Sequence, residues 1–243
     1  MARVVITGSA DGLGRETAQS LLDQGHDVIL HARDAARLEV VRPMLDRGAG
    51  AVTGDLSDLN QVRSVADQVS RLGHVDAVIH NAGVYGGRLV LPVNVVAPYL
   101  LTVLLPGVPR LVYLSSGMHR GGDPSLSQQD WAGDKPGSYS DSKLFVTALA
   151  LAIARLRPEV ASNAVDPGWV PTKMGGAGAP DDLQLGHLTQ EWLATSDEPE
   201  ARSSGGYWFH RRRQPPHAAA QEVQFQDRLI ATLEAVTGES FGP

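Results

Sequence analysis

The sequence predicts an α/β fold, in which helices cover both faces of one doubly wound, mostly parallel sheet of seven strands. Short apolar runs alternate along the chain with segments of helical periodicity, and this alternation is typical of a parallel sheet. A glycine-rich turn joins the first apolar run to the first helical segment, as in nucleotide-binding domains of this class. These two observations predict a single nucleotide-binding domain that spans residues 1–243.

The expected strands are the short runs of apolar and β-branched residues at 3–7, 27–32, 50–53, 76–80, 110–115, 161–165 and 206–209. A helix should follow Asp58, which can cap its first turn, because Leu59 to Leu72 carry one apolar stripe. Between 84 and 109 we expect a short helix that is broken by Pro98 or begins near it. Another helix should run from Tyr139 to Arg155 and end before Pro158.

Composition limits the classes of function. With 243 residues, of which 42% are hydrophobic and 20% charged, the chain can bury one large core. The net charge of −6 argues against a nucleic-acid partner. The basic cluster 211–213 is interpreted as a solvated loop, with a nucleic-acid or second phosphate site as the alternative. The chain has no cysteine, and we expect neither a signal peptide nor a membrane span, so a cytoplasmic location is predicted.

The turn after the first strand has the character of a phosphate site. Gly8, Gly12 and Gly14 allow a tight turn and a close approach of the backbone to a diphosphate, which would face the positive end of the following helix. Three residues separate Gly8 from Gly12, where the usual dinucleotide fingerprint has one. Other positions must therefore decide which nucleotide the turn accepts.

Tyr139 and Lys143 lie four residues apart on a predicted helix, so a phenol and an ammonium share one face. A nearby cation favours the phenolate, and we expect Lys143, together with a positively charged nicotinamide ring, to lower the phenol pKa from its usual value of about 10. Such a pair can serve as an acid-base catalyst. The spacing alone is common on surface helices, and the assignment depends on the other motifs.

Taken in order, these motifs resemble the short-chain dehydrogenase/reductase family over nearly the whole chain, and the resemblance implies a Rossmann fold. It is similar to the retinol-dehydrogenase-like branch and to bacterial oxidoreductases of the family. The resemblance implies that the cofactor is bound by Gly8, Ser9, Asp11, Gly12, Leu13, Gly14, Arg33, Asp55, Leu56, Asn81, Ala82, Gly83, Tyr139, Lys143, Pro167, Gly168, Val170 and Thr172.

The same resemblance implies an oxidoreductase that interconverts a carbonyl and an alcohol by hydride transfer, with Tyr139 as general acid/base. Lys143 would lower the pKa of the phenol and bind the nicotinamide ribose, and Ser116 would donate to the carbonyl oxygen. Asn94 would complete a catalytic tetrad by anchoring a water. Ser115 and Ser116 are adjacent, and successive side chains of a strand point to opposite faces, so only one can reach the substrate. We assign Ser116.

The end of the second predicted strand should select the cofactor, since an acidic residue there binds the ribose 2′-hydroxyl and an arginine accommodates a 2′-phosphate. The strand ends with Ala32 and Arg33, which favours NADP(H) over NAD(H). The alternative is that Asp34 binds the ribose, although Asp34 is also placed to cap the next helix.

The substrate is expected to be an apolar or aromatic ketone, aldehyde or alcohol, because apolar side chains are expected around the nicotinamide. They are Tyr85, Met118, Trp131, Trp169, Met174 and Trp192. A lid is expected around 173–195, where glycines are frequent. We assign no metal site, since His119, His187 and His210 lack the spacing of ligands.

The resemblance implies a homodimer or homotetramer, although the interval between Asn81 and Ser115 is short for the family's interface helix.

Two other functions stay open beside the oxidoreductase. A non-catalytic NAD(P)-sensing module on the same fold is the second function considered. A sugar-nucleotide epimerase or dehydratase is a third, and the short region after Val165 argues against it.

Overall fold

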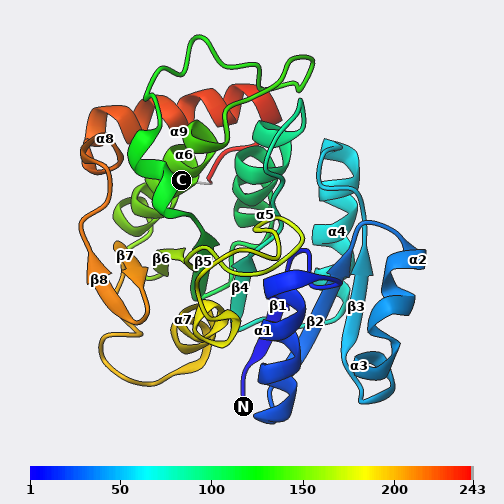
Figure 1. Ribbon diagram of the computed structural model, residues 1–243. Helices are drawn as coiled ribbons and strands as arrows, with labels where there is room; N and C mark the ends of the chain where they lie inside the picture. Colours follow the sequence, from blue (N-terminus) through cyan, green and yellow to red (C-terminus); the bar gives the residue numbers. More distant parts are fainter. Residues whose placement is uncertain (242–243) are drawn as a thin grey trace.

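Seven parallel strands and one antiparallel edge strand form the central sheet of the computed structural model, which describes residues 1–241 (Figure 1). In spatial order the strands are β3 (Gly50–Thr53), β2 (Asp27–Ala32), β1 (Arg3–Ile6), β4 (Ala77–His80), β5 (Arg110–Leu114), β6 (Ala161–Asp166), β7 (Gly206–Phe209) and β8 (Arg212–Gln214). Strands β1 to β7 pair in parallel, and β8 pairs with β7 in the antiparallel direction. The order reverses between β1 and β4, as in doubly wound nucleotide-binding folds.

The predicted fold class is confirmed, and each of the seven predicted strands is present. Strand β8 was not predicted, because its sequence Arg212-Arg213-Gln214 has no apolar residue. His210 and Arg211 form the two-residue turn before it, with positive φ angles of 48° and 58°. The basic cluster 211–213 is exposed to solvent, as predicted. It forms part of a turn and of an edge strand, however, so the prediction of a loop at these residues is wrong.

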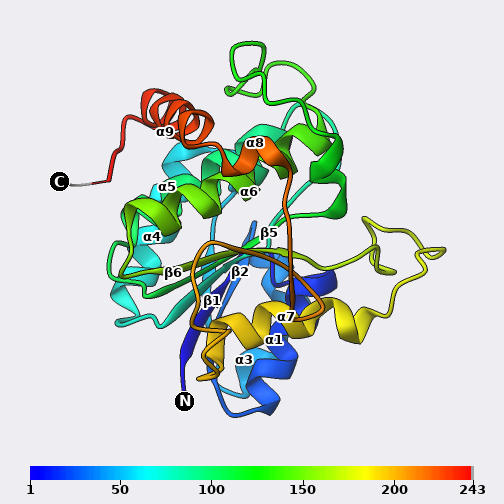
Figure 2. The same cartoon turned by 90° about the vertical axis from the view of Figure 1, so that its left-hand side faces the viewer.

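Helices cover both faces of the sheet, and Figure 2 shows the sheet between the two layers. One layer contains α4 (Leu59–Arg71), α5 (Ala97–Leu104), α6 (Tyr139–Leu156), α8 (Ala218–Gln221) and α9 (Val223–Thr237), which share one buried cluster with the sheet. The other contains α1 (Gly12–Asp23), α3 (Arg42–Asp46) and α7 (Leu183–Thr195), with a second cluster. The short α2 (Ala35–Leu38) and η1 (Glu39–Val41) connect β2 to α3.

Two helices follow their sequence signals closely. Asp58 caps α4 as predicted, since its carboxylate accepts hydrogen bonds from the backbone N–H groups of Asn60 and Gln61. Ser138 caps α6 by accepting from the N–H of Asp141 at 3.2 Å, which starts the helix at Tyr139. From Ser142 to Ile153 every residue of α6 is buried, because the helix lies between the sheet and α8–α9.

The segment before α5 contains a π-helical turn, η2 (Pro92–Val96), which runs directly into α5. The backbone N–H of Ala97 bonds to the carbonyl of Pro92, five residues back. The expected short helix that begins near Pro98 is confirmed by α5, whereas the π-turn was not predicted. None of the helices in the described chain combines the length and the apolar character needed to span a bilayer.

Candidate active site

A crevice lies at the carboxyl ends of the parallel strands, where the order of the sheet reverses. It encloses about 410 Å³. Of the residues assigned to the cofactor, those that line the crevice are Gly8, Asp11, Gly12, Leu13, Arg33, Asp55, Leu56, Asn81, Ala82, Gly83, Tyr139, Lys143, Pro167 and Thr172. Ser9, Gly14, Gly168 and Val170 are not part of this lining.

The glycine turn leaves no space for side chains. Gly8 and Gly12 have φ angles of +66° and +52°, which L-residues rarely adopt. A Cβ built on Gly14 would lie 2.6 Å from the carbonyl oxygen of Gly8, so this helical turn packs directly under the loop. Asp11 caps α1 by accepting from the N–H of Gly12 at 2.9 Å. The exposed backbone and the positive end of α1 together fit a dinucleotide diphosphate.

At the ends of β2 and β3 the crevice is lined by two residues, His31 and Arg37, that were not predicted from the sequence. His31 is buried, accepts from the N–H of Gly8 at 3.0 Å, and bonds through Nε2 to the carbonyl of Gly54 at 2.9 Å. It therefore fixes the glycine turn to β2 and β3. Arg37 lines the crevice beside Arg33, one turn further along the chain. The position of Arg37 four residues after Arg33 was visible in the sequence, whereas the contacts of His31 depend on which strands are neighbours.

Asp34 has the capping role that its position suggested. Its carboxylate accepts from the N–H of Arg37 at 2.9 Å at the start of α2. It also lies 3.7 Å from the guanidinium of Arg33, where both side chains are exposed. Asp34 does not belong to the lining of the crevice, whereas Arg33 does.

Lys143 lies beneath the crevice on α6 and is buried. Its Nζ donates to the carbonyl of Leu114 at 2.7 Å and lies 5.4 Å from the centre of the Tyr139 ring. Burial lowers the pKa of Lys143 to about 8, although the nearby Asp166 opposes this effect. Gly83 lies beside the ammonium, since a Cβ built there would be in ordinary contact with Nζ at 3.7 Å.

The pKa of Tyr139 differs from the expectation. Burial raises it to about 12; the hydrogen bond with Ser116 lowers it, and the negative charge of Asp166 raises it further. The expected lowering of the Tyr139 pKa by Lys143 is therefore wrong for the protein without its cofactor. The ammonium points at the carbonyl of Leu114 rather than at the phenol. Tyr139 is accordingly a neutral proton donor at pH 7.

The two adjacent serines have separate environments. Ser115 is buried, and its hydroxyl lies 2.6 Å from that of Thr147 on α6. Ser116 begins the 3₁₀-helix η3 (Gly117–Gly121), and its hydroxyl accepts from the N–H of Met118 at 3.2 Å. The hydroxyl of Ser116 also interacts with Tyr139. Ser116 is thus the serine whose hydroxyl acts on the Tyr139 phenol, whereas Ser115, and not Ser116, belongs to the lining of the crevice.

Asn94 lies on the π-turn η2, and its side chain is fully engaged. Its Oδ1 accepts from the N–H of Val84 at 2.8 Å, and its Nδ2 donates to the carbonyl of Val84 and to the hydroxyl of Ser142. A Cβ on Gly83 would lie 3.4 Å from Oδ1, so Asn94 and Lys143 face the same glycine.

Exposed apolar side chains border Tyr139, but fewer than expected. The ring of Tyr85 lies 4.8 Å from that of Tyr139, and the sulfur of Met174 lies 3.9 Å from its hydroxyl. Met118 on η3 and Trp169 on the loop after β6 are also exposed. The predicted roles of Trp131 and Trp192 in the pocket are wrong, because these indoles pack against Phe145 and Trp208 in the two cores.

The loop from Pro167 to Asp182 crosses the glycine turn. The ammonium of Lys173 forms an ion pair with Asp11, and Arg37 lies 3.9 Å from the same carboxylate. Thr172 lies against Gly12. Residues 183–195 form α7, which packs against α1, so only 173–182 of the expected lid lacks regular structure.

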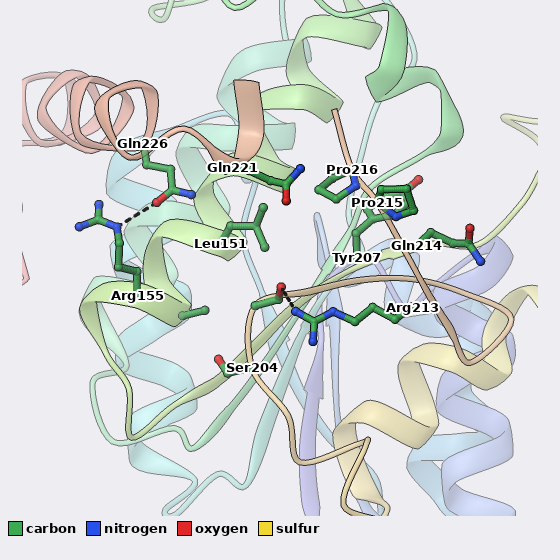
Figure 3. Close-up of a pocket in the computed structure, with 12 residues that line it drawn as sticks. Leu151, Arg155, Ser204, Tyr207, Arg213, Gln214, Pro215, Pro216, Gln221 and Gln226 are labelled. Atoms are coloured by element: carbon green, nitrogen blue, oxygen red, sulfur yellow. Dashed lines mark hydrogen bonds between the residues drawn. The ribbon is translucent and has the colours of Figure 1, made fainter. Parts of the chain in front are cut away.

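A second cavity of about 650 Å³ lies between α6, the β7–β8 hairpin and the α8–α9 segment (Figure 3). Arg213 lines it and donates to the carbonyl of Gly205 at 2.9 Å, whereas the guanidinium of Arg155 bonds to Gln226. None of the predicted cofactor or catalytic residues lines this cavity. It is therefore not the candidate active site.

Comparisons with known proteins agree with this geometry. A family model described as short chain dehydrogenase matches residues 2–97. The short-chain dehydrogenase chry4 of Gibberella zeae is 36% identical over 98% of both chains, and human retinol dehydrogenase 14 is 31% identical over 71% of this chain and 62% of its own length. The crystal structure of an uncharacterized protein from Mycobacterium paratuberculosis covers 100% of this chain and 96% of its own, with 26% identity and a TM-score of 0.79.

The relative with 36% identity is fungal, so the expected similarity to bacterial members in particular is not supported. The similarity to retinol dehydrogenases is confirmed. The relatedness extends over nearly the whole length of the chain, together with the glycine turn, the crevice and the Tyr139–Lys143 pair. The chain therefore belongs to the short-chain dehydrogenase family and is an NAD(P)-dependent oxidoreductase.

Proposed function

We propose that the protein interconverts a ketone or aldehyde and the corresponding alcohol with NADP(H), and that Tyr139 is its general acid/base. The observation that carries the proposal is a half-buried, neutral phenol beside the hydroxyl of Ser116, on the wall of a glycine-lined crevice and one helical turn from Lys143. Each of these groups has a task in carbonyl reduction.

The bound cofactor would supply the hydride, which reaches the carbonyl carbon and leaves negative charge on the oxygen. Tyr139 donates its proton to that oxygen, which completes the alcohol. Ser116 donates a hydrogen bond to the same oxygen and fixes its distance from the phenol. Oxidation of the alcohol would follow the reverse path, with the Tyr139 phenolate accepting the proton.

Lys143 prepares the site for this proton transfer. Its ammonium favours the phenolate that Tyr139 becomes, and it would bond to the nicotinamide ribose once the cofactor approaches. A water held by the backbone of Asn94 would resupply protons through Lys143. Both residues face Gly83, where the crevice wall has no side chain.

Arg33 and Arg37 support NADP(H) as the cofactor. Both line the adenosine end of the crevice, and guanidinium groups bind phosphate by paired hydrogen bonds. Asp34, the competing ribose ligand, caps α2 and does not belong to the lining. In this arrangement the adenosine ribose would lie near the guanidinium groups of Arg33 and Arg37, and Asp34 would not contact it.

The substrate is proposed to be apolar or aromatic. Tyr85 and Met174 flank the phenol, and both have solvent-exposed surface that a substrate would cover. Residues 173–182 would close over it as a lid. A homodimer or homotetramer in the cytoplasm, without nucleic-acid or membrane partners, remains our prediction for the assembly.

The test combines turnover with binding. Purified protein is mixed with NADPH and a panel of aromatic and aliphatic carbonyls, and NADPH consumption is followed by absorbance. We expect Tyr139→Phe to bind NADPH, measured by tryptophan fluorescence, but to lose at least about a thousandfold in kcat. Tyr99→Phe is the matched control, since Tyr99 is buried and bonds to Glu239 away from the crevice. Near-native turnover by Tyr139→Phe would remove this residue from the mechanism.

A further inference from the structure

His119 is a fully buried histidine three residues after Ser116, and the proposed chemistry gives it no task. Its Nδ1 lies 2.8 Å from the carbonyl oxygen of Ser116, and its backbone N–H bonds to the same oxygen at 3.0 Å. Its Nε2 lies 3.0 Å from the backbone nitrogen of His217, in the segment between β8 and α8. The imidazole thus connects the catalytic loop to a distant part of the chain.

The partners of the ring define its protonation state. The backbone N–H of His217 can only donate, so Nε2 must be an unprotonated acceptor. The carbonyl of Ser116 can only accept, so Nδ1 must carry the proton. Neutral His119 in this tautomer satisfies both bonds. A second proton would place Nε2–H against the N–H of His217, and the hydrogen bond between His217 and Nε2 would be lost.

The surroundings of the ring connect the two loops that border Tyr139. The imidazole packs against the ring of Tyr207, with 4.4 Å between their centres. The hydroxyl of Tyr207 donates to Asp166 at 3.0 Å, and the other oxygen of Asp166 accepts from the N–H of Gly168. A Cβ on Gly117 would lie 3.1 Å from Asp166, so the loop after Ser116 packs directly against this carboxylate.

We propose that His119 is a positioning residue, whose neutral, Nδ1-protonated imidazole holds the backbone of Ser116 so that the serine hydroxyl meets Tyr139. This inference rests on the proposed function, in which Ser116 orients the substrate carbonyl. The backbone N–H and the Nδ1–H of His119 both donate to the Ser116 carbonyl. The backbone N–H of His217 holds the ring by donating to Nε2.

The positioning depends on pH. Burial lowers the pKa of His119, and the charges of Arg120 and His217 lower it further, while Asp166 and the hydrogen bond to Ser116 raise it. Tyr207 faces the ring from β7 as a neutral phenol, since its pKa is raised by burial and by Asp166. His119 is therefore neutral at pH 7, and activity should decline at the lower pH at which the ring becomes protonated.

The first experiment replaces the ring. His119→Phe keeps the packing against Tyr207 but removes the donor, and we expect kcat to fall at least about tenfold with NADPH affinity within about twofold. His119→Asn places an amide donor near the Nδ1 position and does not titrate, so it should recover most of kcat and lose the acidic decline. His187→Gln is the control, since this buried histidine pairs with Glu191 between α7 and α1.

The second experiment changes only the anchor. His217 has a φ of −55°, which proline also adopts, so His217→Pro removes its N–H without a forced change of backbone. We expect the acidic decline to move to higher pH in His217→Pro, because Nε2 no longer faces a donor. His217→Ala removes the same side chain, which caps Ala219 and whose charge acts on His119, but keeps the N–H. The acidic decline should therefore lie at a lower pH in His217→Ala than in His217→Pro.

The state of the ring can be measured without turnover. Nitrogen-15 NMR of histidine-labelled protein should show His119 as the Nδ1–H tautomer at pH 7, with the signal assigned from its loss in His119→Asn. An Nε2–H tautomer or a charged ring at pH 7 would overturn the proposal. So would wild-type kcat in His119→Phe when Tyr139→Phe is inactive. Wild-type behaviour of the His119 and His217 variants beside an inactive Tyr139→Phe would overturn this inference alone and leave the proposed function of Tyr139 untouched.

Discussion

Pro98 lies four residues after Asn94 in one continuous helical segment, at the position whose nitrogen would bond to the Asn94 carbonyl in a regular α-helix. Proline has no N–H, so this bond cannot form. The chain forms a π-turn here, in which the N–H of Ala97 reaches the carbonyl of Pro92. Because the side chain of Asn94 is engaged with Val84 and Ser142, the water that we propose for Asn94 would bind to its backbone carbonyl.

Pro98→Ala should supply the missing donor and convert the π-turn to regular helix. We expect the melting temperature to stay the same or rise, since a helical alanine replaces a proline. The carbonyl of Asn94 would then be occupied, and kcat should fall at least about tenfold, with little change in the Kd for NADPH. Pro92→Ala is the control, because Pro92 precedes Asn94 and leaves its carbonyl unchanged. Wild-type kcat in Pro98→Ala would show that this carbonyl has no role.

The sequence alone was sufficient for β1 to β7 and for the glycine turn and strand-end motifs that line the crevice, because both depend on local patterns. Apolar runs bounded by turns located β1 to β7, and the Gly8–Gly14 turn located the crevice. Contacts between distant segments could not be read in the same way. The bond from Gly8 to His31, the burial of Trp192 against Trp208, and the pKa of Tyr139 all depend on which elements meet in space.

The two serines after β5 show where a local rule and the fold combine. The alternation of strand side chains required that only one of them reach the substrate, but it did not determine which one. The structure places Ser115 against Thr147 and Ser116 against Tyr139. This choice depends on α6, which lies beside the end of β5.

Ser116→Ala and Ser115→Ala form a matched pair of variants. Loss of the Ser116 hydroxyl should lower kcat at least about a hundredfold, because the substrate oxygen loses a donor in the transition state. Ser115→Ala should keep kcat within about threefold and lose about 1 kcal/mol of stability, since the Thr147 hydroxyl loses a buried partner. Steady-state kinetics and urea unfolding measure the two effects. The opposite pattern would move the catalytic role to Ser115.

Lys143 should decrease the stability of the fold at neutral pH, because its ammonium is buried. Its pKa is about 8 in the folded protein, against 10.5 for an exposed lysine. Below pH 8 both states are charged and the folded state carries the full cost of about 3 kcal/mol. Between pH 8 and 10.5 the unfolded state binds more protons, so this cost decreases as the pH rises.

Lys143→Met should therefore stabilise the protein by about 2 kcal/mol at pH 7, after the lost hydrogen bond to Leu114 is subtracted, while catalysis is lost. The difference from wild type should decrease towards pH 10. Urea unfolding at both pH values measures it, and Lys135→Met in an exposed loop is the control. A variant that is less stable than wild type at pH 7 would mean that the bond to Leu114 exceeds the cost of burial.

Arg33→Ala should change the choice of cofactor. The guanidinium lines the crevice at the end of β2 and is well exposed, so it can reach a 2′-phosphate but gains nothing from a 2′-hydroxyl. We expect the KM for NADPH to rise about ten- to a hundredfold and that for NADH to change less than about threefold. Arg37→Ala should show the same effect more weakly, because Arg37 also lies near Asp11.

Arg42→Ala is the control for both variants, since Arg42 pairs with Glu39 outside the crevice. Equal increases for both cofactors in Arg33→Ala would mean that the crevice does not distinguish the 2′-phosphate through this residue, and the preference for NADP(H) would lose its support.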